Sequence, residues 1–311
     1  MKTQHLRVLL FATCITATLA AQNRTATGDF QRHDSGDIVA ASAAAPQAEP
    51  AVSGSWGLDF TSAYYFRGIV QENQGMLGQP HLELTYGLAE QVGPVRNLEL
   101  RLGTWNSLHD GPSSAGGPGA KTSAWYESDF YLDLSGSLFD KWSASATYLW
   151  YSSPNAQFNT AEELLLGVSY DDKALWGEGF GGLQPRAALG FEMKGQADGG
   201  GTLGRYLELA VEPEFELGKT GALDWSLSVP VTLGLSAGNY YEHPVTGSNG
   251  FLGFFDIGAV ASTPLPMIPS RFGPWQMSIS LHSLVLGNST KAMNAGDGVE
   301  WIAGLGFSTT F

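Results

Sequence analysis

The chain has one cysteine and no hydrophobic run long enough for a membrane-spanning helix. Cys14 lies in an apolar stretch, residues 8–19, that follows Lys2 and Arg7. A spanning helix needs ~20 apolar residues, so this stretch is too short, and a basic start before a short apolar core is typical of a secretory signal peptide. We expect residues 1–21 to be removed. Lipidation of Cys14 is the alternative, but Thr13 is a poor residue before a lipidated cysteine. The mature chain would contain no cysteine, which excludes disulfides.

Basic residues are also scarce. The 311-residue chain has 16 Lys and Arg against 30 Asp and Glu, and removing the signal takes away two basic residues but no acidic one. This balance argues against nucleic acid as a partner. What the chain has instead is 40 glycines and 12% aromatic residues. Such a composition favours many strands joined by tight turns.

Residues 22–53 are rich in Ala, Gln, Ser, Asp and Pro and show no hydrophobic periodicity. We interpret them as a disordered periplasmic linker. A binding role and simple processing debris both remain open for this segment.

From residue 54 to residue 311 the sequence alternates between apolar and polar residues, with turn residues every ten to twenty positions. This pattern predicts antiparallel strands. The first outward row would be Trp56, Leu58, Phe60, Ser62, Tyr64 and Phe66. Further rows begin at Leu82, Leu98, Tyr126, Trp142, Leu164, Ala187, Leu207, Trp225, Phe251, Trp275 and Val299. The sequence therefore predicts an all-β fold: a transmembrane antiparallel β-barrel of about 12 strands, with both termini in the periplasm.

The last thirteen residues, 299–311, give the clearest strand. One face carries Val299, Trp301 and Phe307 and ends in Phe311, whereas the other is small and polar apart from Ile302. An apolar row with aromatic ends matches a strand between lipid and a wet lumen. Chains ending in this way resemble outer-membrane proteins, whose assembly machinery reads the terminal aromatic residue. We expect an outer-membrane location, with lipid and that machinery as partners and Phe311 as the assembly signal.

The connections alternate between long polar segments, such as 68–79 and 107–123, and mostly shorter ones. This asymmetry is typical of an outer-membrane barrel. Pro213 and Pro230 fall inside adjacent predicted strands and almost face each other. Since proline donates no ladder hydrogen bond, we interpret them as a bulge, or else the strand boundaries here are wrong.

The inward faces of these strands carry most of the charge. The predicted pore-lining residues are Arg67, Glu83, Glu99, Arg101, Glu127, Asp129, Asp133, Glu208, Glu212 and Glu214, and Glu216 extends the acidic row. The facing basic residues are fewer, chiefly Arg67, Arg101, Arg186 and Lys194. An excess of carboxylates in a narrow lumen predicts a preference for cations. Arg67 would pair with Glu83 or Glu99, either to brace the wall or to act in selectivity.

Residues 62–71, Ser-Ala-Tyr-Tyr-Phe-Arg-Gly-Ile-Val-Gln, resemble the first-strand motif S-D-Y-x-F-R-G-x-S-Q of the TorF family of porins. Ala63 and Val70 depart from it at its Asp and second Ser. Residues 102–107 and 127–131 are similar to the family's G-x-W-x-S and E-x-D-x-Y strands, so the detailed resemblance covers the first third of the barrel. It implies a porin-like outer-membrane barrel without catalytic residues.

We expect a passive channel for small solutes, not an enzyme, and no cofactor or metal. The alternatives are an outer-membrane lipid hydrolase or protease and a plugged structural or adhesion barrel. His282 and Ser283 are the most tempting hydrolase pair, but strand neighbours point to opposite faces. His109 with Asp110 would lie in a loop, and Asn294, Asp297 and Glu300 give only a weak calcium pattern. A homo-oligomer is left open.

Overall fold

A computed structural model describes residues 52–113, 124–139, 141–177 and 180–311; the predicted signal peptide and nearly all of the predicted linker lie outside these ranges. Within them, no helix is long and apolar enough to cross a membrane. The strands are β1 (Val52–Thr61), β2 (Tyr64–Phe66), β3 (Ile69–Glu72), β4 (Leu77–Val92), β5 (Val95–His109), β6 (Trp125–Leu138), β7 (Trp142–Tyr151), β8 (Ala161–Tyr170), β9 (Arg186–Lys194), β10 (Arg205–Val211), β11 (Glu214–Thr220), β12 (Leu223–Ser228), β13 (Val231–Gly238), β14 (Leu252–Pro264), β15 (Gln276–Leu286) and β16 (Val299–Thr310). The described ranges also contain the short helices η2 (Lys173–Leu175), η3 (Ser270–Phe272) and α1 (Asn288–Met293).

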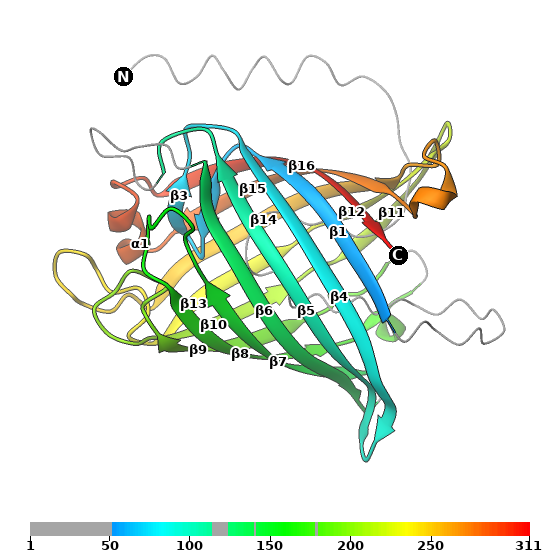
Figure 1. Ribbon diagram of the computed structural model, residues 1–311, viewed down its shortest axis with the longest axis horizontal. Coiled ribbons are helices and arrows are strands. Elements are labelled where there is room, and N and C mark those ends of the chain that lie inside the picture. Colours follow the sequence, from blue (N-terminus) through cyan, green and yellow to red (C-terminus); the bar gives the residue numbers. More distant parts are fainter. Residues whose placement is uncertain (1–51, 114–123, 140, 178–179) are drawn as a thin grey trace.

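These strands form a closed antiparallel barrel (Figure 1). Each wall strand pairs with its neighbours in the sequence, and β1 closes the ring by pairing with β16, where Trp56 lies opposite Thr309. β10 with β11, and β12 with β13, each make one interrupted wall strand, so the wall has twelve strands. The predicted 12-stranded barrel is confirmed. The wall begins at Val52, which pairs with Tyr86, slightly before the predicted boundary at residue 54.

Both interruptions fall at the two prolines. β10 ends before Pro213 and β13 begins after Pro230, and the ladder resumes on both sides of the break. The Pro213 carbonyl accepts a hydrogen bond from the Val229 amide at 2.9 Å, and the Pro230 carbonyl accepts one from the Gly258 amide at 2.8 Å. Pro213 therefore lies opposite Val229, so the two prolines are almost opposite each other, as predicted, and they split two strands without opening the wall.

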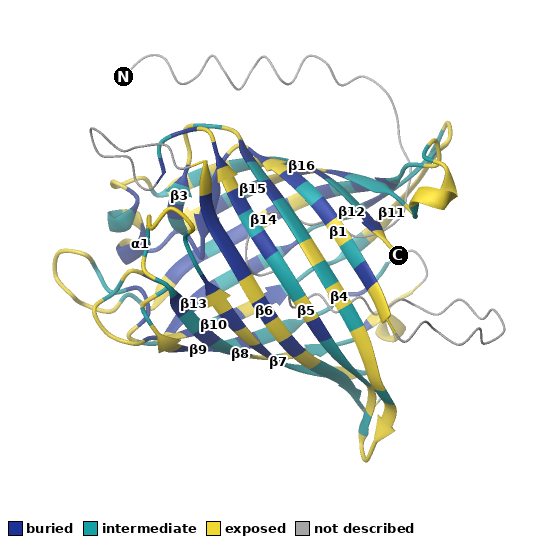
Figure 2. Cartoon of the chain, viewed as in Figure 1, coloured by how far each residue is buried: buried dark blue, intermediate teal, exposed yellow. Residues whose placement is uncertain are grey.

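The outer and inner faces of the wall have opposite chemistry. Outward residues such as Leu102, Phe130 and Trp301 are exposed, and Trp301 is 62% exposed. Their inward neighbours Arg101 and Asp133 are buried. Figure 2 shows this alternation as bands across the strands. An apolar exterior around a charged interior suits a barrel whose solvent is lipid, so this is an outer-membrane β-barrel.

The first predicted outward row is wrong beyond Ser62. β1 ends at Thr61, and the chain then turns into the lumen, where Tyr64 and Phe66 are buried on a separate hairpin, β2–β3. We call the residues 62–76 between β1 and β4 the luminal insert. It lies at the same end of the barrel as α1, which we call the loop end; the chain terminus at Phe311 lies at the other end, the termini end (Figure 1).

Candidate functional site: the luminal insert and its anchors

The luminal insert is built around a two-residue turn, Arg67–Gly68, between Phe66 and Ile69. Both turn residues have positive φ, 48° for Arg67 and 83° for Gly68. Two positive φ angles are what a tight hairpin of this twist requires, and Gly68 meets that requirement without strain. A side chain at position 68 would also press on Phe254, which lies 3.0 Å from the place of an added Cβ. The Arg-Gly dipeptide therefore turns the hairpin and places Arg67 at its tip.

Arg67 is fully engaged inside the barrel. Its two terminal nitrogens donate to the two oxygens of Glu163 on β8, each at 2.8 Å, and Nη1 also donates to the Tyr240 hydroxyl at 2.7 Å. Arg67 and Glu163 are 2% and 0% exposed. A buried ion pair is tolerated when its remaining hydrogen-bonding groups are also satisfied, which this geometry provides. The predicted partners Glu83 and Glu99 are wrong, because Arg67 lies on the insert and reaches another wall.

The backbone of the insert is held from the opposite side of the lumen. Asn294, which follows α1, accepts a hydrogen bond from the Val70 amide and donates one to the Gly68 carbonyl, both at 2.7 Å. The Tyr241 hydroxyl donates to the Arg67 carbonyl at 3.1 Å. Asn294 thus binds the hairpin with both ends of its amide. In the described ranges, no group of three or more His, Cys, Asp and Glu side chains is arranged to hold a metal ion.

The second strand of the hairpin is anchored by His109. A Glu72 carboxylate oxygen lies 3.0 Å from Nδ1 of His109, and the His109 ring stacks on Tyr126 with centroids 4.4 Å apart. His109 also contacts the hydroxyls of Ser107 and Ser113, each at 2.9 Å. The expectation of a solvated loop is wrong, because His109 is the last residue of β5 and is buried.

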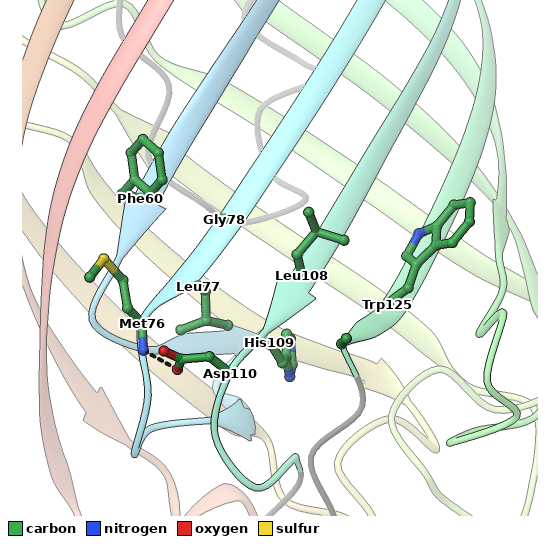
Figure 3. A pocket seen from close by; sticks show the side chains of 9 residues that line it. Phe60, Met76, Leu77, Gly78, Leu108, His109, Asp110 and Trp125 are labelled. Atoms are coloured by element: carbon green, nitrogen blue, oxygen red, sulfur yellow. Dashed lines mark hydrogen bonds between the residues drawn. The ribbon is translucent and has the colours of Figure 1, made fainter.

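A shallow apolar pocket of about 500 Å³ lies on the outer wall beside this anchor (Figure 3). Phe60, Leu108 and Trp125 project around it from three different strands, with Gly78 between them. Asp110 accepts a hydrogen bond from the Met76 amide at 2.7 Å at its edge. The pocket faces the lipid side of the wall, and Asp110 stabilises the end of the insert instead of pairing with His109 as a protease-like acid.

Below the insert, the predicted pore-lining residues of β4, β5 and β6 share one wall. Arg101 pairs with Asp133 at 2.7 Å, and Asp133 also accepts a hydrogen bond from Thr147 at 2.7 Å. Half-buried Glu83 accepts a hydrogen bond from the Tyr131 hydroxyl, and Glu99 lies two residues before Arg101 on the inward face. This wall therefore combines a neutralised pair with further carboxylates.

Glu127 and Asp129 lie closer to the insert. Both are buried on the inward face of β6, and Asp129 accepts a hydrogen bond from the Ser152 amide at 3.1 Å. In the described part of the chain, neither forms an ion pair with lysine or arginine. They place two adjoining carboxyl groups in the lumen beside the hairpin.

The predicted acidic row from Glu208 to Glu216 does not stay together. Glu208 is buried and accepts a hydrogen bond from Tyr206 at 2.8 Å, whereas Glu212 pairs with Arg186 at 3.2 Å. Beyond the break at Pro213, Glu214 is half-buried and Glu216 is exposed. Lys194, expected among the luminal basic residues, is exposed and pairs with Glu162 at 2.7 Å. Only the start of the acidic row thus lies deep in the lumen.

His282 does not form the hydrolase pair. Its Nδ1 lies 2.8 Å from an Asp256 oxygen on β14, and its Nε2 has no hydrogen-bond partner in the described part of the protein. His282 is buried on the inward face, and Ser283 alternates away from it. A nucleophile within reach of the histidine, which such catalysis requires, is therefore not assembled here.

Phe311 closes the ring at the termini end. Its backbone amide and carbonyl each bond to Gly54 at 2.9 Å, whereas its side chain is 63% exposed. The ring is therefore free to meet lipid or a protein partner, while the backbone completes the β1–β16 seam.

The sequence analysis missed the residues that hold the insert, namely Glu163, Tyr151, Tyr240, Tyr241 and the amide of Asn294. One signal was available for Glu163. Glu163 is two residues before buried Leu165, so both side chains point to the same face of β8, whereas Leu164 and Leu166 point to the other face. The alternation of residues along β8 therefore places Glu163 inside the barrel. No local pattern pairs it with Arg67, which is 96 residues away.

The sequence matches no family profile and no characterised protein. Among solved structures, the barrel is similar to the COG4313 outer membrane channel from Pseudomonas putida F1 (11% identity, 85% of this chain and 97% of that chain, TM-score 0.45). It is also similar to the NanC porin (10% identity, 83% and 98%, TM-score 0.43) and to the β domain of the Bordetella autotransporter BrkA (10% identity, 83% and 98%, TM-score 0.38). The resemblance to the TorF family stays a prediction.

Proposed function

We propose that this barrel is a channel for passive diffusion of small, preferentially cationic solutes and that the luminal insert narrows it at the loop end. The protein would carry out no reaction. The observation that carries the proposal is the unequal pairing of charges inside the wall.

Each luminal arginine already has an acidic partner: Arg67 pairs with Glu163, Arg101 with Asp133, and Arg186 with Glu212. Glu83, Glu127 and Asp129 remain inside the barrel without an ion pair to lysine or arginine among the residues the structure describes. Carboxylates in a narrow pore attract cations and repel anions. The net field of the lumen therefore favours cations.

The insert would narrow the path at the loop end. The insert brings Tyr64, Tyr65 and Phe66 into the lumen, where they pack against Trp105, Tyr151 and Phe254 among other buried residues. In a barrel of twelve strands the lumen is already narrower than in larger porins, so an inserted hairpin restricts passage strongly. We propose that solutes pass when the insert moves from its anchors.

Purified protein in planar bilayers under a potassium chloride gradient tests the proposal. The reversal potential should show cation selectivity, and Glu83→Gln should weaken it, since Glu83 lies on the inward face of β4. Glu162→Gln is the matched control, because Glu162 pairs with exposed Lys194 at the loop end. Anion selectivity, or equal effects of the two changes, would contradict the proposed role of the lumen charges. Absence of any current would favour a plugged structural barrel.

A further inference from the structure

Arg67 is held by an arrangement of aromatic side chains as well as by Glu163. Its guanidinium carbon lies 4.0 Å from the centre of the Tyr206 ring, 5.0 Å from that of Phe66 and 5.5 Å from that of Tyr240. The Tyr151 hydroxyl accepts a hydrogen bond from Nη2 at 3.4 Å and donates one to Glu163 at 2.8 Å. We call Glu163, Tyr151, Tyr206 and Tyr240 the cation cage.

The cation cage has the chemistry that selects a planar organic cation. Its carboxylate accepts two parallel hydrogen bonds from a guanidinium fork, and its aromatic faces attract the positive charge. Three of its members come from the wall strands β7, β8 and β10, and Tyr240 comes from the loop after β13. Only the occupant, Arg67, comes from the insert. The cage therefore belongs to the barrel wall and one of its loops, whereas Arg67, the cation that fills the cage, belongs to the luminal insert.

We propose that the cation cage is a binding site for solutes of the guanidinium class and that Arg67 occupies it as an internal ligand. A solute with the same cationic group would replace Arg67, keep Glu163 paired, and release the insert. This inference rests on the proposed channel function and names the class of solute that opens the channel.

The charges around the cage suit this exchange. Removing Arg67 alone would leave Glu163 buried and unpaired, which is strongly unfavourable, whereas replacement by another guanidinium keeps that ion pair. Glu192 lies within electrostatic range of Glu163, and Asp129 within range of Tyr151, so further carboxyl groups surround the site. The hairpin that carries Arg67 has strands of only three and four residues. An isolated two-stranded hairpin is marginal, so the insert depends on its anchors.

A simple structural brace would not need the cage. Arg101 with Asp133 is such a brace: it is also buried and charge-paired, yet among the described residues no aromatic ring makes a cation–π contact with Arg101. Within the described ranges, the other cation–π contact is that of Arg271 over Phe272, outside the lumen at 4.8 Å. Asp133 therefore provides the matched control for Glu163.

The experiment uses the full mature chain and methylguanidinium chloride, with urea and sodium chloride at equal concentration as probes of shape and ionic strength. In planar bilayers, methylguanidinium should raise the open probability of the wild-type protein in a saturable way. Glu163→Gln should increase the half-saturating concentration by roughly tenfold or more, because it removes a charge-assisted bidentate acceptor, and Asp133→Asn should leave it nearly unchanged.

A binding measurement keeps the inference falsifiable if channels are difficult to record. Arg67→Ala empties the cage, so methylguanidinium should raise its unfolding temperature at lower concentrations than it does for the wild-type protein. Different mobility of boiled and unboiled Arg67→Ala protein in detergent gels would verify that the barrel is folded. Arg67→Lys, which keeps the charge but loses the planar fork, is the second variant and should give an intermediate response.

The two proposals fail in different ways. If the protein conducts cations but Arg67→Ala responds to methylguanidinium no more than to sodium chloride, the cation cage is only a brace and this inference is wrong. If Arg67→Ala binds methylguanidinium but no variant conducts, the site stands and the channel proposal is wrong. An equal loss of response in Asp133→Asn and Glu163→Gln would also overturn the inference, since it would assign the effect to the general acidity of the lumen.

Discussion

The amide of Asn294 offers the most direct way to loosen the luminal insert without changing its charge. Asn294→Ala removes the acceptor of the Val70 amide and the donor to the Gly68 carbonyl, each now bonded at 2.7 Å. Gly68 and Val70 are both buried. A buried polar group left without a partner costs about 1–3 kcal/mol. With some replacement by water, the change should destabilise the inserted hairpin by about 2–4 kcal/mol.

The change should destabilise the anchored position of the insert and not the barrel wall, because Asn294 lies outside the strands. Since 1.4 kcal/mol corresponds to a factor of ten, the ratio of open to closed time in single-channel records should rise roughly 30- to 700-fold. Asn294→Asp keeps an acceptor for the Val70 amide but places a carboxylate oxygen against the Gly68 carbonyl, so it should give a rise at least as large.

Asn155→Ala is the control, because it removes a single hydrogen bond to the Trp125 carbonyl in an exposed loop-end segment. It should leave channel opening unchanged. Equal open probabilities for Asn294→Ala and the wild-type protein, with both folded, would refute the view that this amide holds the insert in the lumen.

Two further predictions concern assembly and the termini end. Phe311→Ala should reduce the yield of inserted protein far more than Trp301→Ala, a similarly exposed aromatic of the same last strand; equal yields in membrane fractions would mean that Phe311 is only another lipid-facing residue. Burial alone would raise the pKa of Asp172, but hydrogen bonds from the Trp176 indole and from the Leu183 and Gln184 amides outweigh burial and lower it. Because its folded-state pKa is lowered, Asp172 stabilises the fold above its ordinary pKa and loses that contribution as the pH falls through the lowered value. Thermal unfolding of Asp172→Asn should therefore show a smaller loss of stability across that acidic window than the wild-type protein, with Asp171→Asn as the control; identical pH profiles for Asp172→Asn and the wild-type protein would contradict this role.

The barrel wall could be predicted from the sequence because lipid and lumen impose opposite demands on alternate residues. The last strand shows this clearly, since exposed Trp301 and Leu305 alternate with smaller residues that face the interior. Such a pattern recurs in other wall strands, such as β10 and β15, and needs no knowledge of distant contacts. The number of strands and the closed topology followed from it.

The same pattern misled at the luminal insert. β2 is itself a strand, so the alternation of Tyr64 and Phe66 continues that of β1, although the chain has left the wall. Periodicity reports that a segment is extended but not which sheet it joins. The tight turn at Arg67–Gly68 was the local signal that a hairpin begins there.

The partners of the insert could not be predicted for another reason. Glu163 and Asn294 are distant from Arg67 in the sequence, and only closure of the barrel brings all three to one end. The acidic row from Glu208 to Glu216 is divided for a local reason, because the break at Pro213 separates buried Glu208 from exposed Glu216. The alternation of residues predicts which face of the wall a side chain lies on. Its depth in the lumen and its hydrogen-bond partner depend on the tertiary structure.

The most direct test of the central claim, that the luminal insert closes an otherwise conducting barrel, is the conductance of a chain without it. Thr61 and Leu77 are paired neighbours on β1 and β4, so Asn-Gly in place of residues 62–76 can join them as a tight hairpin turn. The wild-type protein should show rare openings, and the shortened protein, folded by gel mobility, should show a large, steady, cation-selective current. A shortened barrel that is folded and inserted but conducts no better than the wild-type protein would contradict the account.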